Sequence, residues 1–162
     1  MLSELYIEHI AVISQATIRL GPGLNVFTGE TGAGKTMLIS AINAVLGART
    51  SRDIIRTGEA RGMVSALFTG IPEDVAAQID RLGFSAEDGQ LLVTRTLEAG
   101  GGGSSKIGGR PATAALLREV CGLLIDIHGQ HDNQELLSPE RHVRFLDSFG
   151  DLQPQLRAYQ EA

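Results

Sequence analysis

Residues 29–36 read GETGAGKT and match G-x-x-x-x-G-K-[ST], the spacing of a glycine-rich loop that binds nucleotide phosphates. Glycines let the backbone approach an anion closely, and consecutive N–H groups point at it together with the N-terminus of a following helix. The spacing predicts that Lys35 reaches the β- and γ-phosphates of ATP and that the Thr36 hydroxyl coordinates Mg²⁺. A glycine-rich turn with a solvated lysine is the alternative. The residues predicted to hold the nucleotide are Gly29, Glu30, Thr31, Gly32, Ala33, Gly34, Lys35 and Thr36.

Hydrolysis needs more than this loop, because phosphoryl transfer also requires an acid that holds the metal and a group that orients the attacking water. The apolar segment LLIDI, residues 123–127, offers Asp126, but strand alternation places that side chain on the side of the strand rather than at its tip. Gln130 follows the same segment and has the chemistry to contact both Mg²⁺ and water. We therefore predict Gln130 as the catalytic and second metal-contacting residue.

A metal site near Gln130 is a further alternative, because His128, His131 and Asp132 lie beside it in the sequence. This H-x-x-H-D pattern lacks the remaining ligands of a zinc centre. Structural loop histidines are therefore the interpretation that the pattern favours.

The elements around the loop place it between a strand and a helix. The run LNVFT, residues 24–28, is typical of a short buried strand. After Thr36, the apolar residues recur at helical spacing as far as Gly47, which is placed to end the helix. This strand–loop–helix order distinguishes a phosphate-binding loop from a chance match.

The rest of the chain alternates between strand and helix patterns. Strands are predicted over residues 4–13, 16–20, 62–68, 90–97 and 123–127, with a further short strand and turn over 106–112. Helices are predicted over 72–83, over 113–121 with Thr113 as N-cap, and from Ser138 onward. The four glycines at 100–103 predict a flexible hairpin tip.

Composition limits the class of protein. The chain has 162 residues, of which 43% are hydrophobic and 20% charged, which suits one globular domain. No run approaches the length of a membrane span, and Cys121 is the single cysteine, so we expect a cytoplasmic protein with Cys121 as a small buried hydrophobe. The net charge is −5, yet four arginines cluster after the first predicted helix: Arg49, Arg52, Arg56 and Arg61. This cluster is either a solvated loop or a patch that faces phosphates.

Three segments together resemble the N-terminal part of the RecN family, bacterial DNA-repair ATPases related to the structural-maintenance-of-chromosomes (SMC) proteins. They are residues 2–49, which contain GETGAGKT, the segment DIIRTG, and LLIDIHGQHDNQELL. The resemblance implies an α/β fold of the P-loop NTPase class, namely the N-terminal lobe of an ATP-binding-cassette head with a mixed sheet and flanking helices. It also implies that residues 1–150 form this lobe and that 151–162 begin a helix leading to a coiled coil.

The same resemblance assigns roles to single residues and to partners. It implies that 29–36 are the Walker A loop, that Gln130 is the Q-loop glutamine, and that Arg49 or Arg52 faces nucleotide or DNA. The signature motif, the Walker B acids and the switch histidine of the family would belong to a C-terminal lobe, because no match for them occurs here. This implication decides against Asp126 as the metal-holding acid. The implied partners are that lobe, a second copy through heads and coiled coil, and DNA at the nucleoid.

The sequence therefore predicts the ATP-binding half of a RecN-like head that acts with Mg²⁺ in double-strand-break repair. Hydrolysis would require the other lobe and dimerisation of heads, so the chain alone is expected to be inactive. The alternative is an ATP-switched module that organises DNA with negligible hydrolysis.

Overall fold

The structure is a computed structural model that describes residues 1–28, 34–127, 149–150, 152 and 159. It divides into two compact units, Met1–Ile125 and Asp126–Ala162. The description below concerns the first unit.

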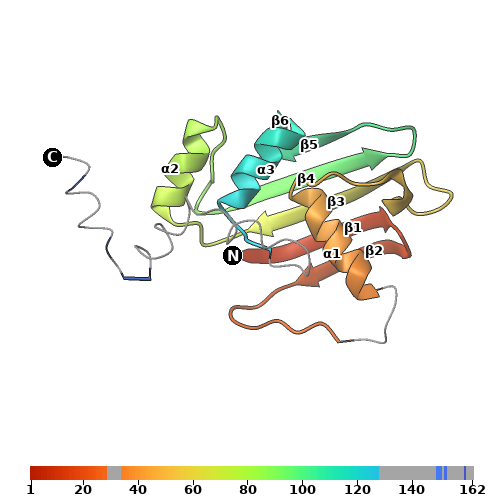
Figure 1. Cartoon of the computed structure of the whole chain (residues 1–162), viewed down its shortest axis with the longest axis horizontal. Helices are drawn as coiled ribbons and strands as arrows, with labels where there is room; N and C mark the ends of the chain where they lie inside the picture. The colour runs from red at the N-terminus through yellow and green to blue at the C-terminus, as the bar shows by residue number, and fades with distance from the viewer. Residues whose placement is uncertain (29–33, 128–148, 151, 153–158, 160–162) are drawn as a thin grey trace. The chain divides into compact units, whose positions relative to one another are not determined.

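The first unit is built on a six-stranded sheet whose strand order is β2-β1-β3-β4-β5-β6 (Figure 1). Every pair of neighbouring strands is antiparallel. These strands correspond to the antiparallel part of the mixed sheet that we expected. Their bounds are β1 Leu2–Ile10, β2 Ile13–Arg19, β3 Arg61–Phe68, β4 Leu91–Glu98, β5 Gly103–Ile107 and β6 Arg110–Ala112.

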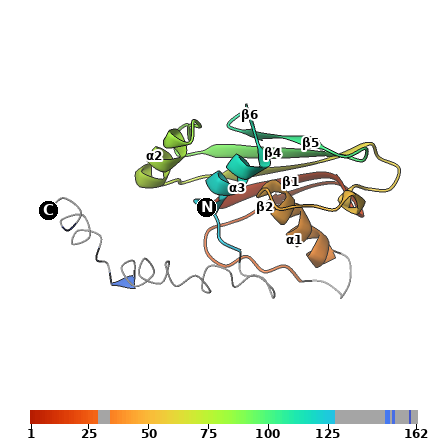
Figure 2. The ribbon, with the colours of Figure 1, turned by 45° about the horizontal axis from the view of Figure 1, so that its top comes forward.

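The helices within the first unit are α1 Gly34–Val45, α2 Glu73–Arg81 and α3 Ala114–Gly122, with a short 3-10 turn η1 at Arg52–Ile54. Helices α1 and α3 lie on the same face of the sheet, whereas α2 lies at the end where β3 finishes and β4 starts (Figure 2). The core is therefore the layer between this sheet face and the two helices.

Strand alternation explains which residues face the helices. In β4 the buried positions are Leu91, Val93 and Leu97, which are an even number of residues apart and therefore face the same way. Arg95 belongs to the same inward-facing set. The register aligns it with Val64 of β3 on one side and with Ser105 of β5 on the other. A guanidinium and a hydroxyl thus occupy adjacent positions on a face that is otherwise apolar.

Several local predictions are confirmed. Gly47 follows α1 with a φ of +88°, and the Oγ1 atom of Thr113 accepts a hydrogen bond from Leu116 N at 3.2 Å as the N-cap of α3. The glycine run forms the connection between β4 and β5, with positive φ at Gly101 and Gly102. Cys121 is buried, and burial raises the pKa of its thiol to about 12, so it behaves as an apolar side chain.

Two predicted strands are wrong. Residues 24–28 do not join the sheet, and Leu24 and Val26 are 90% and 69% exposed instead of buried. Residues 123–127 form a turn after α3 followed by irregular chain, and Asp126 is exposed. Apolar runs form buried strands only when neighbouring strands satisfy their backbone groups, and the described residues supply no such neighbour to either segment.

Candidate nucleotide-binding site

The last three residues of the predicted phosphate-binding loop form the start of α1. Gly34, Lys35 and Thr36 are all exposed in the first turn of this helix. The other loop residues, 29–33, and the predicted catalytic Gln130 lie outside the described residues. The roles given to these residues therefore stay predictions.

The start of α1 has the properties that an anion site needs. Amide N–H groups of the first turn have no partner within a helix, and the helix dipole places positive charge at this end. The first turn contains no acidic residue that would compete with a bound anion. Gly34 has an ordinary helical backbone rather than a left-handed one, and none of the described residues lies within 4 Å of the position of its missing Cβ atom. Gly34 thus contributes open space for a ligand.

The body of α1 is fixed to the sheet by one apolar face. Leu38, Ala41, Ala44 and Val45 are buried at spacings of three, three and one residues, which places them on one side of the helix. Ile39 is 50% exposed, so it lies outside the buried face despite its apolar character. This packing holds the helix while its first turn remains accessible.

The C-terminal end of α1 is fixed by backbone and side-chain hydrogen bonds. Ala48 N donates to Asn43 O at 3.0 Å and Gly47 N donates to Ala44 O at 3.1 Å, the two bonds of a Schellman motif. The Nη1 atom of Arg95 donates to Ala44 O at 2.8 Å and to Ala48 O at 2.7 Å. Positive charge at this end of a helix is favourable, because the dipole is negative there.

A second arginine completes this arrangement. Arg118 of α3 donates through Nη2 to Gly47 O at 2.9 Å. Burial, and then the nearby charge of Arg118, lower the pKa of Arg95. Helices α1 and α3 approach so closely that a Cβ atom on Gly47 would lie 2.9 Å from both Ala114 O and Arg118 N. The loop-bearing helix is therefore held between β4 and α3.

Neither arginine was predicted from the sequence as part of this site. For Arg95 a signal existed: Leu91, Val93 and Leu97 alternate on the inward face of the predicted strand, and Arg95 continues that series. An arginine at an inward position requires buried acceptors, so the pattern indicated a structural or binding role. Arg118 had no comparable signal, because its acceptor is a carbonyl more than seventy residues away.

The arginine cluster after α1 has mixed roles. The Nη1 atom of Arg56 donates to Val12 O at 2.6 Å, so Arg56 ties this segment to the turn between β1 and β2. Arg49 and Arg61 are exposed. The side chain of Arg52 lies outside the described part of the structure. Arg56 is thus a structural contact, while Arg49 and Arg61 are accessible to a ligand.

The structure adds little about metals or membranes. Across the described residues, no three His, Cys, Asp or Glu side chains group in a way that could hold a metal ion. His128, His131 and Asp132 lie outside those residues. Within the same described set, no helix is both long enough and apolar enough to span a bilayer.

Comparison with known proteins adds family relationships to this geometry. Residues 4–151 match the sequence family described as "AAA domain". The chain is 43% identical over 150 residues to the DNA repair protein RecN of Halalkalibacterium halodurans, covering 92% of this chain and 26% of that protein. It is 39% identical over 166 residues to the DNA repair protein RecN of Bacillus subtilis, covering 99% of this chain and 28% of that protein. The chain therefore spans about a quarter of the length of these relatives.

A solved structure shows the same fold. It is described as "Structural biochemistry of ATP-driven dimerization and DNA stimulated activation of SMC ATPases", and it aligns with a TM-score of 0.63 at 20% identity. The alignment covers 91% of this chain and 98% of that one. The first unit therefore has the fold of an SMC-type ATPase head lobe, which belongs to the P-loop NTPases.

Proposed function

Because the chain belongs to the RecN family of DNA repair proteins, we propose that it is the N-terminal, ATP-binding lobe of an ATPase head. The complete protein would act in the repair of DNA double-strand breaks by recombination, in the cytoplasm at the nucleoid. The names of the relatives and the fold of the head lobe support this proposal.

The described residues at the start of α1 suit the phosphates of a nucleoside triphosphate. Lys35 and Thr36 are exposed at the positive end of α1, where a cation and a hydroxyl beside the amides of the first helical turn suit phosphate oxygens. Lys35 would bind the β- and γ-phosphates, and Thr36 together with Gln130 would hold Mg²⁺. When bound, that metal ion neutralises the charge that develops on the phosphates. Gln130 would also orient the attacking water.

One observation carries the proposal that a second lobe is needed. The segment that leads into the loop exposes Leu24, Val26 and Phe27 at 90%, 69% and 46%. Large apolar residues that lie so close together in the chain rarely remain in water in a functional protein, and such patches mark interaction sites. We propose that the C-terminal lobe of the same protein covers these side chains, since this chain spans only about a quarter of the length of its relatives. Docking of that lobe would fix residues 24–28 and with them the loop.

This assignment has consequences for activity and assembly. The chain alone would not hydrolyse ATP, because the second lobe would supply the acid and the signature motif. A homodimer, formed through heads and coiled coil, would complete each nucleotide site and engage DNA.

The experiment is complementation between separately purified lobes. ATP turnover is measured for residues 1–162, for the C-terminal lobe, and for their mixture, with linear DNA present. We expect turnover only in the mixture and its loss with Lys35→Ala. Turnover by residues 1–162 alone at the rate of the complete protein would contradict the proposal.

A matched pair of variants tests the role of the exposed segment. Val26 and Val12 are both exposed valines, at 69% and 62%, but only Val26 belongs to the segment before the loop. Val26→Asn should reduce complementation by the C-terminal lobe, whereas Val12→Asn should leave it unchanged. Equal effects of the two substitutions would show that another surface docks the lobe.

A further inference from the structure

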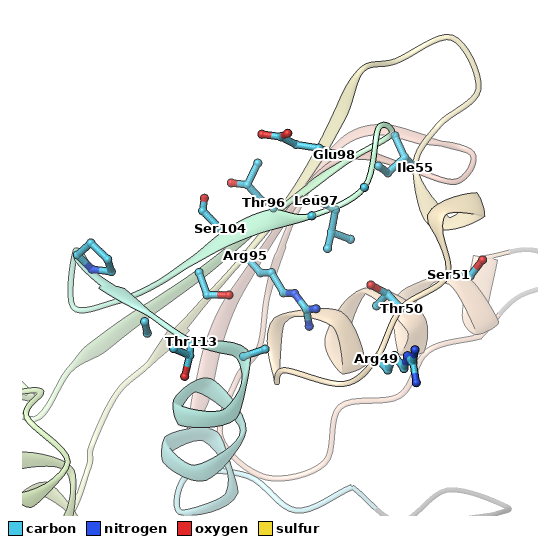
Figure 3. A pocket seen from close by; sticks show the side chains of 17 residues that line it. Arg49, Thr50, Ser51, Ile55, Arg95, Thr96, Leu97, Glu98, Ser104 and Thr113 are labelled. Carbon is cyan, nitrogen blue, oxygen red and sulfur yellow. The ribbon is translucent and has the colours of Figure 1, made fainter.

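A cavity of about 590 Å³ lies beside the C-terminal end of α1, at the opposite end of this helix from Lys35 (Figure 3). Pockets for small ligands have volumes of about 300–1,000 Å³, so this one is large enough for a ligand. Strands β4 and β5 line one side of the cavity, the segment after α1 another, and the start of α3 a third. The residues that matter here are Arg49, Arg95, Ser105, Thr113 and Ala114.

Ser105 contributes a hydroxyl group to the lining of this cavity. It is 9% exposed and is the buried polar residue of the described chain. Its hydroxyl group makes no hydrogen bond with any described residue, although it lines the cavity. No buried side-chain oxygen or nitrogen of the described residues lacks a partner, so the Ser105 hydroxyl is reached from the cavity and is available to a ligand there.

Arg95 lies next to Ser105 and has unused donors. The register pairs these two residues across β4 and β5. Both hydrogen bonds of the guanidinium use Nη1, which leaves Nε and Nη2 without a protein acceptor among the described residues. No described carboxylate forms an ion pair with Arg95. The edge formed by Nε and Nη2 is the one that suits two oxygens of an anion.

The surroundings of Arg95 are also positive. Arg118 lies close enough to lower the pKa of Arg95, and Arg49 is an exposed cation of the lining. Thr113 and Ala114 bring the positive N-terminal end of α3 to the same cavity. The side chain of Glu98, the acidic residue of the lining, projects from the face of β4 opposite to the one that carries Arg95 (Figure 3). A bound anion would relieve the repulsion between these charges.

We propose that this cavity binds a phosphate group, with Arg95 and Ser105 as its principal donors and Arg49 at its rim. The site is distinct from the loop at the start of α1, because the 12 residues of α1 separate the two ends by about 18 Å. Phosphate is favoured over carboxylate because its oxygens are arranged to accept from a planar guanidinium and from a hydroxyl at the same time. A free phosphorylated compound and a nucleic-acid backbone share this chemistry.

The test uses the full-length protein carrying Lys35→Ala, which removes phosphate binding at the loop and so keeps the two sites separate. Isothermal titrations are performed with pyrophosphate, with a short DNA duplex, and with glutamate as a carboxylate control. Ser105→Ala is the main variant, since it removes only the hydroxyl group. Ser14→Ala is the matched control, because Ser14 is an exposed serine of β2 outside the cavity. Arg95→Gln is the second variant, with thermal melting as a check on folding.

We expect saturable binding of pyrophosphate or of DNA, weakened about tenfold by Ser105→Ala and lost with Arg95→Gln. Ser14→Ala should have no effect. Without ligand, Ser105→Ala should melt close to the temperature of its parent, because the hydroxyl makes no hydrogen bond with any described residue. Saturation by pyrophosphate identifies a free phosphate compound as the source, whereas saturation by DNA alone identifies the nucleic-acid backbone.

Three outcomes would overturn the proposal. They are no saturable binding of either phosphate probe, binding that Ser105→Ala leaves unchanged, and glutamate binding as tight as that of pyrophosphate. None of these outcomes depends on whether Lys35 binds ATP. The experiment therefore tests this cavity independently of the proposed nucleotide site.

Discussion

Substituting Gly47 by alanine tests how closely the loop-bearing helix depends on its contact with α3. Gly47 has a φ of +88°, and its added Cβ atom would lie 2.9 Å from two backbone atoms, Ala114 O and Arg118 N. Backbone atoms cannot move aside as the end of a side chain can. The alanine must therefore push α3 away from α1 or distort the end of α1.

Two terms contribute to the expected loss of stability. A left-handed backbone at a residue with a Cβ atom costs about 1–2 kcal/mol. Overpacking of a close contact costs a further ~1–3 kcal/mol. The free energy of unfolding should therefore fall by about 2–5 kcal/mol. Gly58 offers a matched control, because its φ is +90° but nothing lies within 4 Å of its Cβ position. Gly58→Ala should lose only the first term.

The measurement is urea denaturation of the parent protein and the two variants, followed by circular dichroism. The m-value should stay constant, so that differences in midpoint report stability. A larger loss for Gly47→Ala than for Gly58→Ala, by about 1–3 kcal/mol, measures the cost of separating the helices. Equal losses would refute the argument that the helices are in essential contact at Gly47.

Three further predictions concern activity. Lys35→Ala should abolish ATP binding without changing the circular dichroism spectrum, because Lys35 is an exposed residue of the first turn of α1; wild-type affinity in a nucleotide titration would contradict its role. Gln130→Ala in the full-length protein should keep ATP binding but slow ATP turnover by about 10²–10³-fold, the usual effect of losing one positioned polar group. Unchanged turnover together with lower stability would show that Gln130 is a structural loop residue. Replacing four arginines together by glutamine should weaken DNA binding by the full-length protein and reduce the dependence of that binding on salt concentration; the four are Arg49, Arg52, Arg56 and Arg61. Arg56→Gln alone is the control for lost structure, because Arg56 makes a structural hydrogen bond. An unchanged dependence on salt would show that the cluster is ordinary solvated surface.

Elements whose partners are close in sequence were predictable from the chain. The turn at Gly47 and the cap at Thr113 depend on local backbone conformation, so a glycine after an apolar helix and a threonine before one were sufficient signals. The strands of the sheet alternate because one face contacts helices, and this alternation was visible in β3 and β4.

The errors concern two segments that have no neighbouring strand among the described residues. Residues 24–28 and 123–127 have the composition of buried strands, but composition does not reveal whether a neighbouring strand exists. The two arginines at the end of α1 were missed for a related reason. Their acceptors are backbone carbonyls, which every residue possesses, so no sequence pattern marks the partners of Arg95 and Arg118.

The strand order has a consequence for how this polypeptide is made. From β3 to β6, each strand pairs with the next one along the chain, through connections that are never longer than the segment containing α2. Pairing between sequence neighbours closes small loops and forms quickly compared with distant pairing. The meander from Arg61 to Ala112, with β1 already available to its first strand, can therefore assemble while later residues are still emerging from the ribosome. A nascent chain would then carry this six-stranded sheet before the residues that follow Ala112 have been synthesised.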